Sequence, residues 1–259
     1  MRLSGQTHVV VGGSTGWGRA VSQQLAKEGA DVVIVDAAGG DLDQVERDMV
    51  SAGGKVRIFA ADIGNLADLK RVAAQLGGGI SGLATQYMAL EWGSFEHADM
   101  DRFEEVVVHN LVGPARAVQA FLPLLRQQGK GAILHLTSID GVNGNPRVPS
   151  YSAAKGGIGP LTNVMSFEFA KYDIRVNALA TGLTVQMKDF PPEAERAMPG
   201  FPGFAYARQL NDATPLKRYG PMTEWAKSAT FLLSQDSDYM TGTMMIVDCG
   251  RLSITPGTA

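Results

Sequence analysis

Cysteine, histidine and long apolar runs are all scarce in this 259-residue sequence. The one cysteine, Cys249, cannot form a disulfide within the chain, so we expect a reducing compartment such as the cytoplasm. The four histidines are scattered without the spacing of metal ligands, which predicts no metal site. No apolar run approaches the roughly 20 residues that cross a bilayer, and we therefore expect no membrane partner.

A strong excess of charge is also lacking. The formal net charge is -3, which predicts no electrostatic attraction to nucleic acid. Hydrophobic residues make up 45% of the chain, enough to bury a substantial core. The composition therefore predicts a soluble, intracellular globular protein.

The N-terminal stretch has the pattern of a strand, a glycine-rich turn, a helix and a second strand. An apolar, β-branched run over 9–11 precedes the turn 12–18, a helix is expected over 19–28, and a strand over 31–36. The glycines of the turn let the backbone approach a diphosphate, which then rests on the helix N-terminus. This arrangement predicts a dinucleotide site, against the alternative of a purely structural turn.

Asp36 ends the second expected strand and bears on the choice of cofactor. A carboxylate there can accept both ribose hydroxyls of NAD and would repel the 2′-phosphate of NADP. Ala37 and Ala38 follow, so no Arg or Lys offsets that repulsion. The sequence therefore predicts NAD, with NADP the less favoured alternative. The residues predicted to hold the cofactor in this unit are Gly12, Ser14, Thr15, Gly16, Trp17, Gly18 and Asp36.

Strands and helices alternate along the rest of the chain. Further strands are expected over 56–60, 82–85, 132–138, 174–179 and 244–247. Further helices are expected over 41–52, 65–76, 99–125, 151–171 and 223–234. These repeated units predict an α/β fold with a single doubly wound parallel sheet, Rossmann-like, and helices on both faces. No break in composition divides the chain, so residues 1–259 are expected to form one domain.

Residues 182–213 depart from this alternation because they are rich in proline, glycine, phenylalanine and methionine. An irregular insertion after a strand end is often a substrate-binding lid. Its apolar residues predict an apolar substrate, with packing onto the body of the protein as the alternative.

Ser138, Tyr151 and Lys155 lie in one stretch that begins at the end of the expected strand 132–138. Tyr151 and Lys155 are four residues apart, which stacks the phenol and the ammonium on one helix face. A cation close to a phenol lowers its pKa from about 10 toward neutrality, so Tyr151 would exchange a proton with a substrate alcohol. Ser138 would lie at the sheet edge where open α/β folds bind ligands. The same spacing also occurs on solvated helix faces, so the surrounding fold decides between the two interpretations.

Pro114 lies within the expected helix 99–125. It has no N–H, so the carbonyl of Asn110 loses its helical partner, and a kink is expected there. Two interpretations stay open: the carbonyl holds a water or ligand, or the kink is only structural.

The assembled motifs resemble those of the short-chain dehydrogenase/reductase family over roughly residues 5 to 250. The glycine turn is similar to the family's T-G-x-x-x-G-x-G, and the stretch Arg175-Val176-Asn177 is similar to its R-V-N strand. The four positions of the family's catalytic tetrad are matched by Asn110, Ser138, Tyr151 and Lys155.

The resemblance implies an NAD(P)-dependent oxidoreductase that transfers hydride between a nicotinamide cofactor and a secondary alcohol or ketone. It implies that Tyr151 is the general acid or base, that Lys155 lowers its pKa and binds the nicotinamide ribose, and that Ser138 holds the substrate oxygen. It also implies a proton relay through a water on the carbonyl of Asn110. Further cofactor contacts are implied for Asp62, Ile63, Gly182 and Thr184, together with Tyr151 and Lys155.

One departure from the family falls after the fourth expected strand, where N-N-A-G is replaced by Thr85-Gln86-Tyr87-Met88. The bulky Tyr87 and Met88 are expected to line the substrate pocket together with Ser138 and Tyr151, and would narrow it. Two smaller departures are Thr181-Gly182 in place of P-G and Cys249 in place of a glycine in the final D-G-G.

Three functions follow from these observations. The leading one is an NAD-dependent dehydrogenase of an apolar secondary alcohol, cyclic or aromatic. An NADP-linked ketone or 3-oxoacyl reductase is the nearest alternative, and a dinucleotide-binding module without turnover is an alternative of another class. The resemblance further implies a small-molecule substrate and a homo-oligomer, tetramer or dimer, often joined through the helices that carry Asn110 and Tyr151.

Overall fold

A single parallel sheet organises the chain. The computed structural model describes residues 1–38, 42–182, 209–210 and 212–253. The strands follow the order β3-β2-β1-β4-β5-β6-β7, and every neighbouring pair is parallel. Their bounds are β1 (Thr7–Val11), β2 (Asp31–Asp36), β3 (Lys55–Ala60), β4 (Gly82–Thr85), β5 (Gly131–Ser138), β6 (Ile174–Thr181) and β7 (Met244–Val247).

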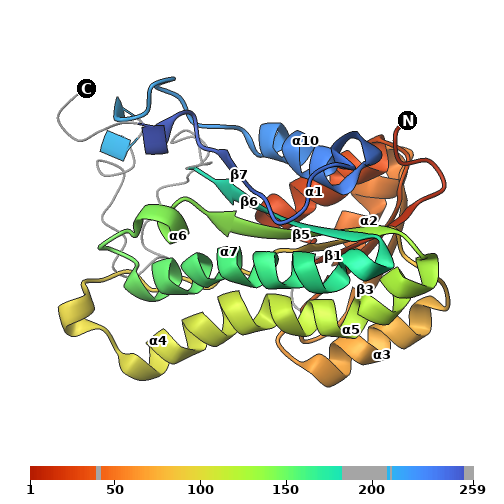
Figure 1. Ribbon diagram of the computed structural model, residues 1–259, viewed down its shortest axis with the longest axis horizontal. Coiled ribbons are helices and arrows are strands. Elements are labelled where there is room, and N and C mark those ends of the chain that lie inside the picture. The colour runs from red at the N-terminus through yellow and green to blue at the C-terminus, as the bar shows by residue number, and fades with distance from the viewer. Residues whose placement is uncertain (39–41, 183–208, 211, 254–259) are drawn as a thin grey trace.

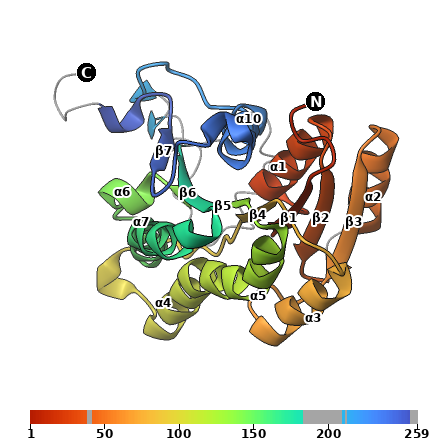
Figure 2. The same ribbon diagram turned by 45° about the vertical axis from the view of Figure 1, so that its right-hand side comes forward.

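Helices cover both faces of this sheet, because each parallel connection must cross back over it (Figures 1 and 2). One face carries α1 (Gly16–Lys27), α2 (Leu42–Ser51) and α10 (Met222–Leu233). The other carries α3 (Leu66–Leu76), α4 (Met100–Val107), α5 (Gly113–Gln128) and α7 (Pro149–Phe169). A short helix, α6 (Asp140–Asn143), connects β5 to α7. The predicted doubly wound α/β fold is confirmed.

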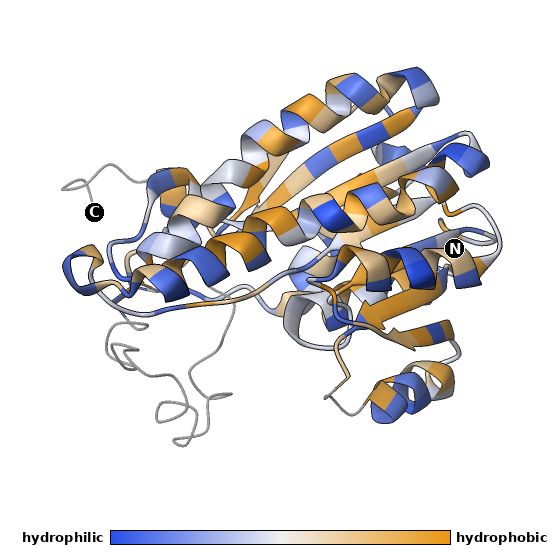
Figure 3. Cartoon of the chain, turned by 90° about the horizontal axis from the view of Figure 1, so that it is seen from below, coloured by the Kyte–Doolittle hydropathy of each residue, from blue (hydrophilic) through white to orange (hydrophobic). Residues whose placement is uncertain are grey.

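The central strands are apolar along most of their length because both of their faces are covered. Every residue of β4, β5 and β6 is buried. Leu134 and Leu179 pack toward α1 and α10, whereas Ile133 and Val176 pack toward α3, α5 and α7. Each such side chain contributes about 1.5–3 kcal/mol through its removal from water. Figure 3 shows hydrophobic residues along the strands, while the helices alternate between hydrophobic and hydrophilic.

The helix expected over 99–125 is divided by a π-helical turn. Asp99 caps α4, since its carboxylate accepts hydrogen bonds from two N–H groups of the first turn at 2.9 and 3.2 Å. The π-helical turn Val108–Val112 follows, and α5 begins at Gly113, directly before Pro114. The N–H of Gly113 reaches back five residues to the carbonyl of Val108. The interruption expected near Pro114 is therefore confirmed, and it takes the form of a widened turn.

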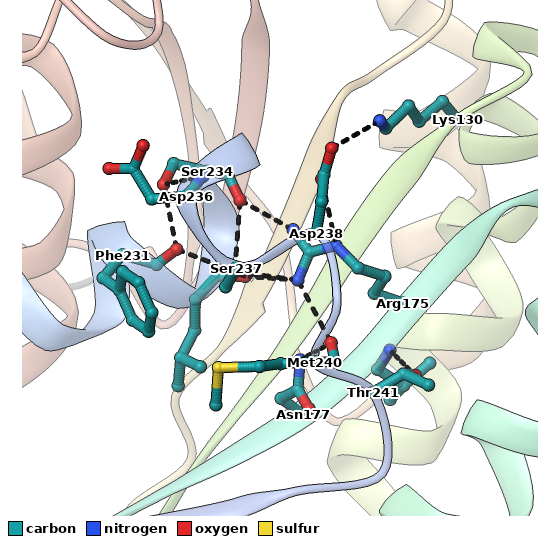
Figure 4. A network of polar contacts seen from close by, with 12 residues as sticks. Lys130, Arg175, Asn177, Phe231, Ser234, Asp236, Ser237, Asp238, Met240 and Thr241 are labelled. Atoms are coloured by element: carbon teal, nitrogen blue, oxygen red, sulfur yellow. Dashed lines mark hydrogen bonds and ion pairs between the residues drawn. The ribbon is translucent and has the colours of Figure 1, made fainter.

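Arg175 ties α10 and the chain before β7 to the sheet (Figure 4). Its guanidinium donates to the carbonyls of Leu232 at 3.0 Å and Ser234 at 2.8 Å, which end α10. Two residues along β6, the side chain of Asn177 donates to the carbonyl of Met240 at 2.8 Å. A cation at a helix C-terminus meets carbonyls that have no helical partner, so this network fixes α10 against β6.

The predicted lid over 182–213 falls mostly outside the described residues, and the predicted cofactor residue Thr184 lies outside them as well. Among the described helices, none has both the length and the apolar character needed to cross a bilayer.

Two histidines lie inside the sheet, His8 on β1 and His135 on β5. Both side chains are fully buried, and burial lowers the pKa of each to about 4. Between pH 4 and 6.5 the unfolded chain therefore binds more protons at these positions than the folded chain does. The contribution of the two neutral histidines to the free energy of unfolding is therefore fully present above about pH 6.5 and is lost as the pH falls toward 4.

We predict that the free energy of unfolding, measured by urea titration, falls between pH 6.5 and 4 by up to about 3 kcal/mol for each histidine. The His8→Gln variant should lose about that much less over the same range, because it has no proton to take up. The exposed His97 provides a matched control, and His97→Gln should follow the wild type. Equal pH dependence in His8→Gln and wild type would contradict the prediction.

Candidate active site

The carboxyl ends of all seven strands lie at one edge of the sheet because the strands are parallel. At this edge β1 and β4 are neighbours, yet the chain leaves β1 into α1 on one face and leaves β4 toward α4 and α5 on the other (Figure 2). Such a switch point is where open α/β sheets bind their ligands. The predicted site residues that the structure describes belong to segments that begin at this edge.

Close backbone contacts shape the glycine turn between β1 and α1. Gly12 has a φ of 77°, and a Cβ atom there would lie 1.9 Å from the carbonyl oxygen of Gln86. A Cβ at Gly18 would lie 1.9 Å from the carbonyl oxygen of Gly12, so α1 starts directly against the turn. Gly16, in contrast, has open space at its Cβ position, and the N-cap residue Thr15 makes no side-chain capping bond. This cradle and helix N-terminus fit the diphosphate of a dinucleotide.

Asp36 closes β2 and is held against the glycine turn. One carboxylate oxygen accepts hydrogen bonds from the N–H of Ser14 at 3.0 Å and from its hydroxyl at 2.6 Å. The other oxygen accepts from the N–H of Ala37 at 2.9 Å. The carboxylate is thereby fixed beside the turn, where it is available to ribose hydroxyls.

The other described residues that are predicted to contact the cofactor lie at the same edge. Asp62 and Ile63 follow β3, the strand paired with β2. Gly182 directly follows β6, and its backbone packs against the segment after β7. Trp17 makes an edge-to-face contact with Trp225 at a ring distance of 5.4 Å, which joins α1 to α10.

Ser138, Tyr151 and Lys155 come together between β5 and α7. Ser138 is the last residue of β5, while Tyr151 lies in the first turn of α7 and Lys155 one turn further on. The Nζ of Lys155 lies 5.6 Å from the centre of the Tyr151 ring, and the hydroxyl of Ser138 accepts a hydrogen bond from the N–H of Asp140 at 3.1 Å. Tyr151 and Lys155 are 3% and 1% exposed, so the alternative of a solvated helix face does not apply.

Burial dominates the electrostatics of this pair. It raises the pKa of Tyr151, the carboxylate of Asp140 adds to the rise, and the hydrogen bond with Ser138 opposes it. Burial also lowers the pKa of Lys155 to about 7, because the charged ammonium is withdrawn from water. Burial therefore acts against the lowering of the Tyr151 pKa that is expected from Lys155, and that lowering stays a prediction.

Sequence reasoning missed two polar residues beside this group. Asp140 follows Ser138 by two positions, and burial raises the pKa of its carboxyl. His135 shares a 2.8 Å hydrogen bond with the hydroxyl of Thr85, and its Nε2 has no partner among the described residues. The available signal was a histidine inside the apolar run 132–136, because a buried polar side chain needs a partner.

Asn110 lies in the π-helical turn and is fully buried. Its side-chain amide holds the backbone of Ala89 at both ends, donating to the carbonyl at 2.8 Å and accepting from the N–H at 3.1 Å. It also donates to the carbonyl of Val106 at 2.9 Å. The side chain of Asn110 thus fixes the segment that follows β4.

Tyr87 and Met88, expected to line the substrate pocket, occupy different environments. Met88 is 45% exposed, whereas Tyr87 is 1% exposed. The Tyr87 hydroxyl donates to the carbonyl of Ile63 at 2.8 Å, and a Cβ at Gly113 would lie 2.5 Å from its ring. The expectation for Tyr87 is corrected accordingly: its ring packs into the space that a glycine on α5 leaves open.

Comparison with known proteins agrees with this fold and site. A family model described as Enoyl-(Acyl carrier protein) reductase matches residues 11–251. 2-(S)-hydroxypropyl-CoM dehydrogenase 3 of Xanthobacter autotrophicus is 31% identical, with 98% of this chain and 99% of the relative covered. 2,5-Dichloro-2,5-cyclohexadiene-1,4-diol dehydrogenase of Sphingobium indicum is also 31% identical, with 97% and 99% covered.

A solved structure from Beutenbergia cavernae, described with bound NADP at low occupancy, superimposes with a TM-score of 0.87. It is 27% identical and covers 97% of this chain and 98% of its own. The chain therefore belongs to the short-chain dehydrogenase/reductase family, as the motifs indicated. It is an NAD(P)-dependent oxidoreductase of the short-chain type that acts between alcohols and ketones.

The open space at Gly16 provides a test of the cofactor cradle. We predict that Gly16→Ala weakens NADH binding at least about tenfold, because the added methyl group occupies the approach of the diphosphate. Its stability should fall by only about 1 kcal/mol, the cost of a left-handed alanine. Fluorescence titration with NADH and thermal unfolding measure the two effects.

Gly77 is a matched control, because it has a φ of 70° and equally open space but caps α3. Gly77→Ala should lose similar stability and bind NADH like the wild type. Wild-type affinity in Gly16→Ala would show that the turn does not hold the cofactor.

Proposed function

We propose that the protein is an NAD-preferring dehydrogenase that interconverts a secondary alcohol and a ketone on a largely apolar, cyclic substrate. The observation that carries this proposal is the buried group of Ser138, Tyr151 and Lys155 at the same sheet edge as the glycine turn. The name of the Sphingobium indicum relative, a dehydrogenase of a cyclohexadiene diol, supports a cyclic substrate.

In the proposed mechanism this chain orients the substrate and moves its proton, while a bound nicotinamide dinucleotide supplies or accepts the hydride. Ser138 holds the substrate oxygen by a hydrogen bond. The phenol of Tyr151 exchanges the proton with that oxygen, donating it in ketone reduction and accepting it in alcohol oxidation. Lys155 has a pKa of about 7, and in its charged form it favours the deprotonated form of the Tyr151 phenol. Asn110 keeps the backbone after β4 in place through Ala89.

Asp36 supports the choice of NAD over NADP. Its carboxylate is held by Ser14 at the end of β2, and a 2′-phosphate there would meet a negative charge. The neighbours Ala37 and Ala38 carry no charge to offset the repulsion. The NADP bound in the Beutenbergia cavernae structure favours the second candidate, an NADP-linked ketone reductase.

We also infer a single catalytic domain, a cytoplasmic location and a homo-oligomer. The last inference is supported by two apolar side chains of α7, since Val164 is 62% exposed and Phe167 is 89% exposed. Large apolar side chains that stand in water on one helix favour contact with another chain. The helix is the one that carries Tyr151, as expected from the family resemblance.

We predict that Tyr151→Phe lowers turnover of a cyclic secondary alcohol at least about a thousandfold, because the variant lacks the hydroxyl that moves the proton. NADH affinity should stay within about twofold, since only a hydroxyl is removed. Steady-state kinetics over a panel of alcohols and fluorescence titration provide the measurements. Tyr172→Phe, a change of the same kind in the short 3-10 helix that follows α7, should behave as wild type. Substantial turnover in Tyr151→Phe would refute the role given to this residue.

A second prediction concerns Asp36→Asn, which keeps an oxygen for Ser14 but removes the charge. We expect discrimination between NADH and NADPH to relax by about tenfold, because the repulsion of the 2′-phosphate is lost. Asp31→Asn, at the other end of the same strand, should leave the ratio of the two dissociation constants unchanged. An unchanged ratio in Asp36→Asn would contradict the assignment.

A further inference from the structure

The segment from Gln86 to Ala89, which follows β4, joins three parts of the proposed site through its backbone. The N–H of Gln86 donates to the carbonyl of Val11 at 2.8 Å, and its carbonyl lies directly against Gly12. Ala89 is held at both its N–H and its carbonyl by the side chain of Asn110. The segment is therefore held at Gln86 by β1 and the glycine turn, and at Ala89 by hydrogen bonds to the π-helical turn.

Tyr87, between these two fastenings, makes a different contact at each of its ends. Its backbone carbonyl accepts a hydrogen bond from the Nζ of Lys155 at 2.8 Å, and its hydroxyl donates to the carbonyl of Ile63 at 2.8 Å. The ring between them is fixed on both sides. It meets His109 edge-on at 5.3 Å, and it fills the space left by Gly113.

A lysine side chain is long and has many rotamers, so its ammonium takes one position only where hydrogen bonds hold it. The bond from the Nζ of Lys155 to the carbonyl of Tyr87 is such a bond. Apart from Tyr87, the described acceptor of its ammonium is the carbonyl of Leu136 at 3.2 Å. The shorter bond is to Tyr87. The position of the Tyr87 carbonyl therefore decides where the ammonium stands relative to the Tyr151 phenol.

The contact with Ile63 matters because this residue and Asp62 follow β3, next to the strand that ends at Asp36. The hydroxyl of Tyr87 is a buried donor, and its removal leaves the carbonyl of Ile63 without this partner. A buried acceptor that loses its donor costs free energy, so the loop after β3 would shift to find another.

We propose that Tyr87 is a positioning residue that couples the loop at Ile63, a residue predicted to contact the cofactor, to the ammonium of Lys155. This inference rests on the proposed function, because it assigns a task toward a dinucleotide bound at that site. Tyr87 keeps the loop after β3 in a fixed position relative to the pair of Tyr151 and Lys155. A tyrosine whose ring only fills the core would not have this effect.

The test uses Tyr87→Phe, which keeps the ring and removes the bond to Ile63. We expect the affinity for ADP-ribose, which lacks the nicotinamide, to fall about fivefold, and kcat for alcohol oxidation to fall by a similar factor. Tyr172→Phe is the matched control and should change neither quantity. Loss of thermal stability with both quantities unchanged would overturn the proposal, since that is what a structural filler predicts.

A second variant approaches the same ring from α5. Gly113→Ala introduces a methyl group where a Cβ would lie 2.5 Å from the Tyr87 ring, and alanine itself is well suited to a helix. It should displace the ring and reproduce both losses without touching Ile63 or Lys155. Wild-type values of ADP-ribose affinity and kcat in a folded Gly113→Ala protein would count against the proposal.

A double-mutant cycle then isolates the coupling. The effects of Tyr87→Phe and Lys155→Met on the NADH dissociation constant should depart from additivity by at least threefold. Additive effects would overturn the proposal.

Measurements on the wild-type protein distinguish a failure of the role of Tyr87 from a failure of the proposed function. If it binds NADH and oxidises an alcohol while Tyr87→Phe behaves normally, only the role of Tyr87 fails. If the wild type binds no NADH, the proposed function fails first.

Discussion

A lysine ammonium that is buried away from water needs oxygen acceptors around it. In this protein the arrangement of the proposed site depends on how that requirement is met at Lys155. Lys155 is 1% exposed and donates to two backbone carbonyls, one in β5 and one in the segment after β4. Because burial lowers its pKa to about 7, the balance between its charged and neutral forms depends on how those carbonyls are placed. The sheet fixes the position of the β5 carbonyl. The position of the other carbonyl is fixed by the hydrogen bonds that the side chains of Asn110 and Tyr87 make.

The other buried cation described above, Arg175, shows how much this depends on the type of side chain. Its guanidinium also donates to main-chain carbonyls, at the end of α10. Arginine keeps its charge at any physiological pH, so Arg175 serves as a permanent fastening between α10 and β6. Lysine loses its proton far more easily when buried, which makes Lys155 suited to chemistry that moves protons. Similar surroundings therefore serve structure at Arg175 and suit the proposed proton transfer at Lys155.

Much of the fold could be predicted because its signals are local. The apolar runs of β5 and β6, the glycine turn and the cap at Asp99 each identify an element from neighbouring residues alone. The grouping of Ser138, Tyr151 and Lys155 followed from a strand end and a helical spacing. Bounds shifted by a few residues: α7, for example, begins at Pro149 rather than at Tyr151.

The features that escaped prediction depend on contacts between distant segments. The direction of the Tyr151 pKa follows from the exclusion of water, which spacing along a helix does not reveal. The orientation of Tyr87 requires the absence of a side chain at Gly113, on another element. The widened turn at Val108–Val112 was expected only as a kink, because a missing N–H locates a break without specifying its geometry.

The parallel order of the strands also determines how the site comes into being as the chain folds. Gly12 and Asp36 belong to two separate strand–helix units, Ser138 and Lys155 belong to a third, and each neighbouring pair of strands is joined only after a long crossover. Loop closure must precede every such pairing, so contacts of this kind form late. A chain with only its first two strands in place would present the glycine turn without the proton-transferring pair. The glycine turn and the group of Ser138 and Lys155 thus share one edge only when β4 and β5 are paired, so the proposed site is a property of the assembled sheet rather than of any fragment.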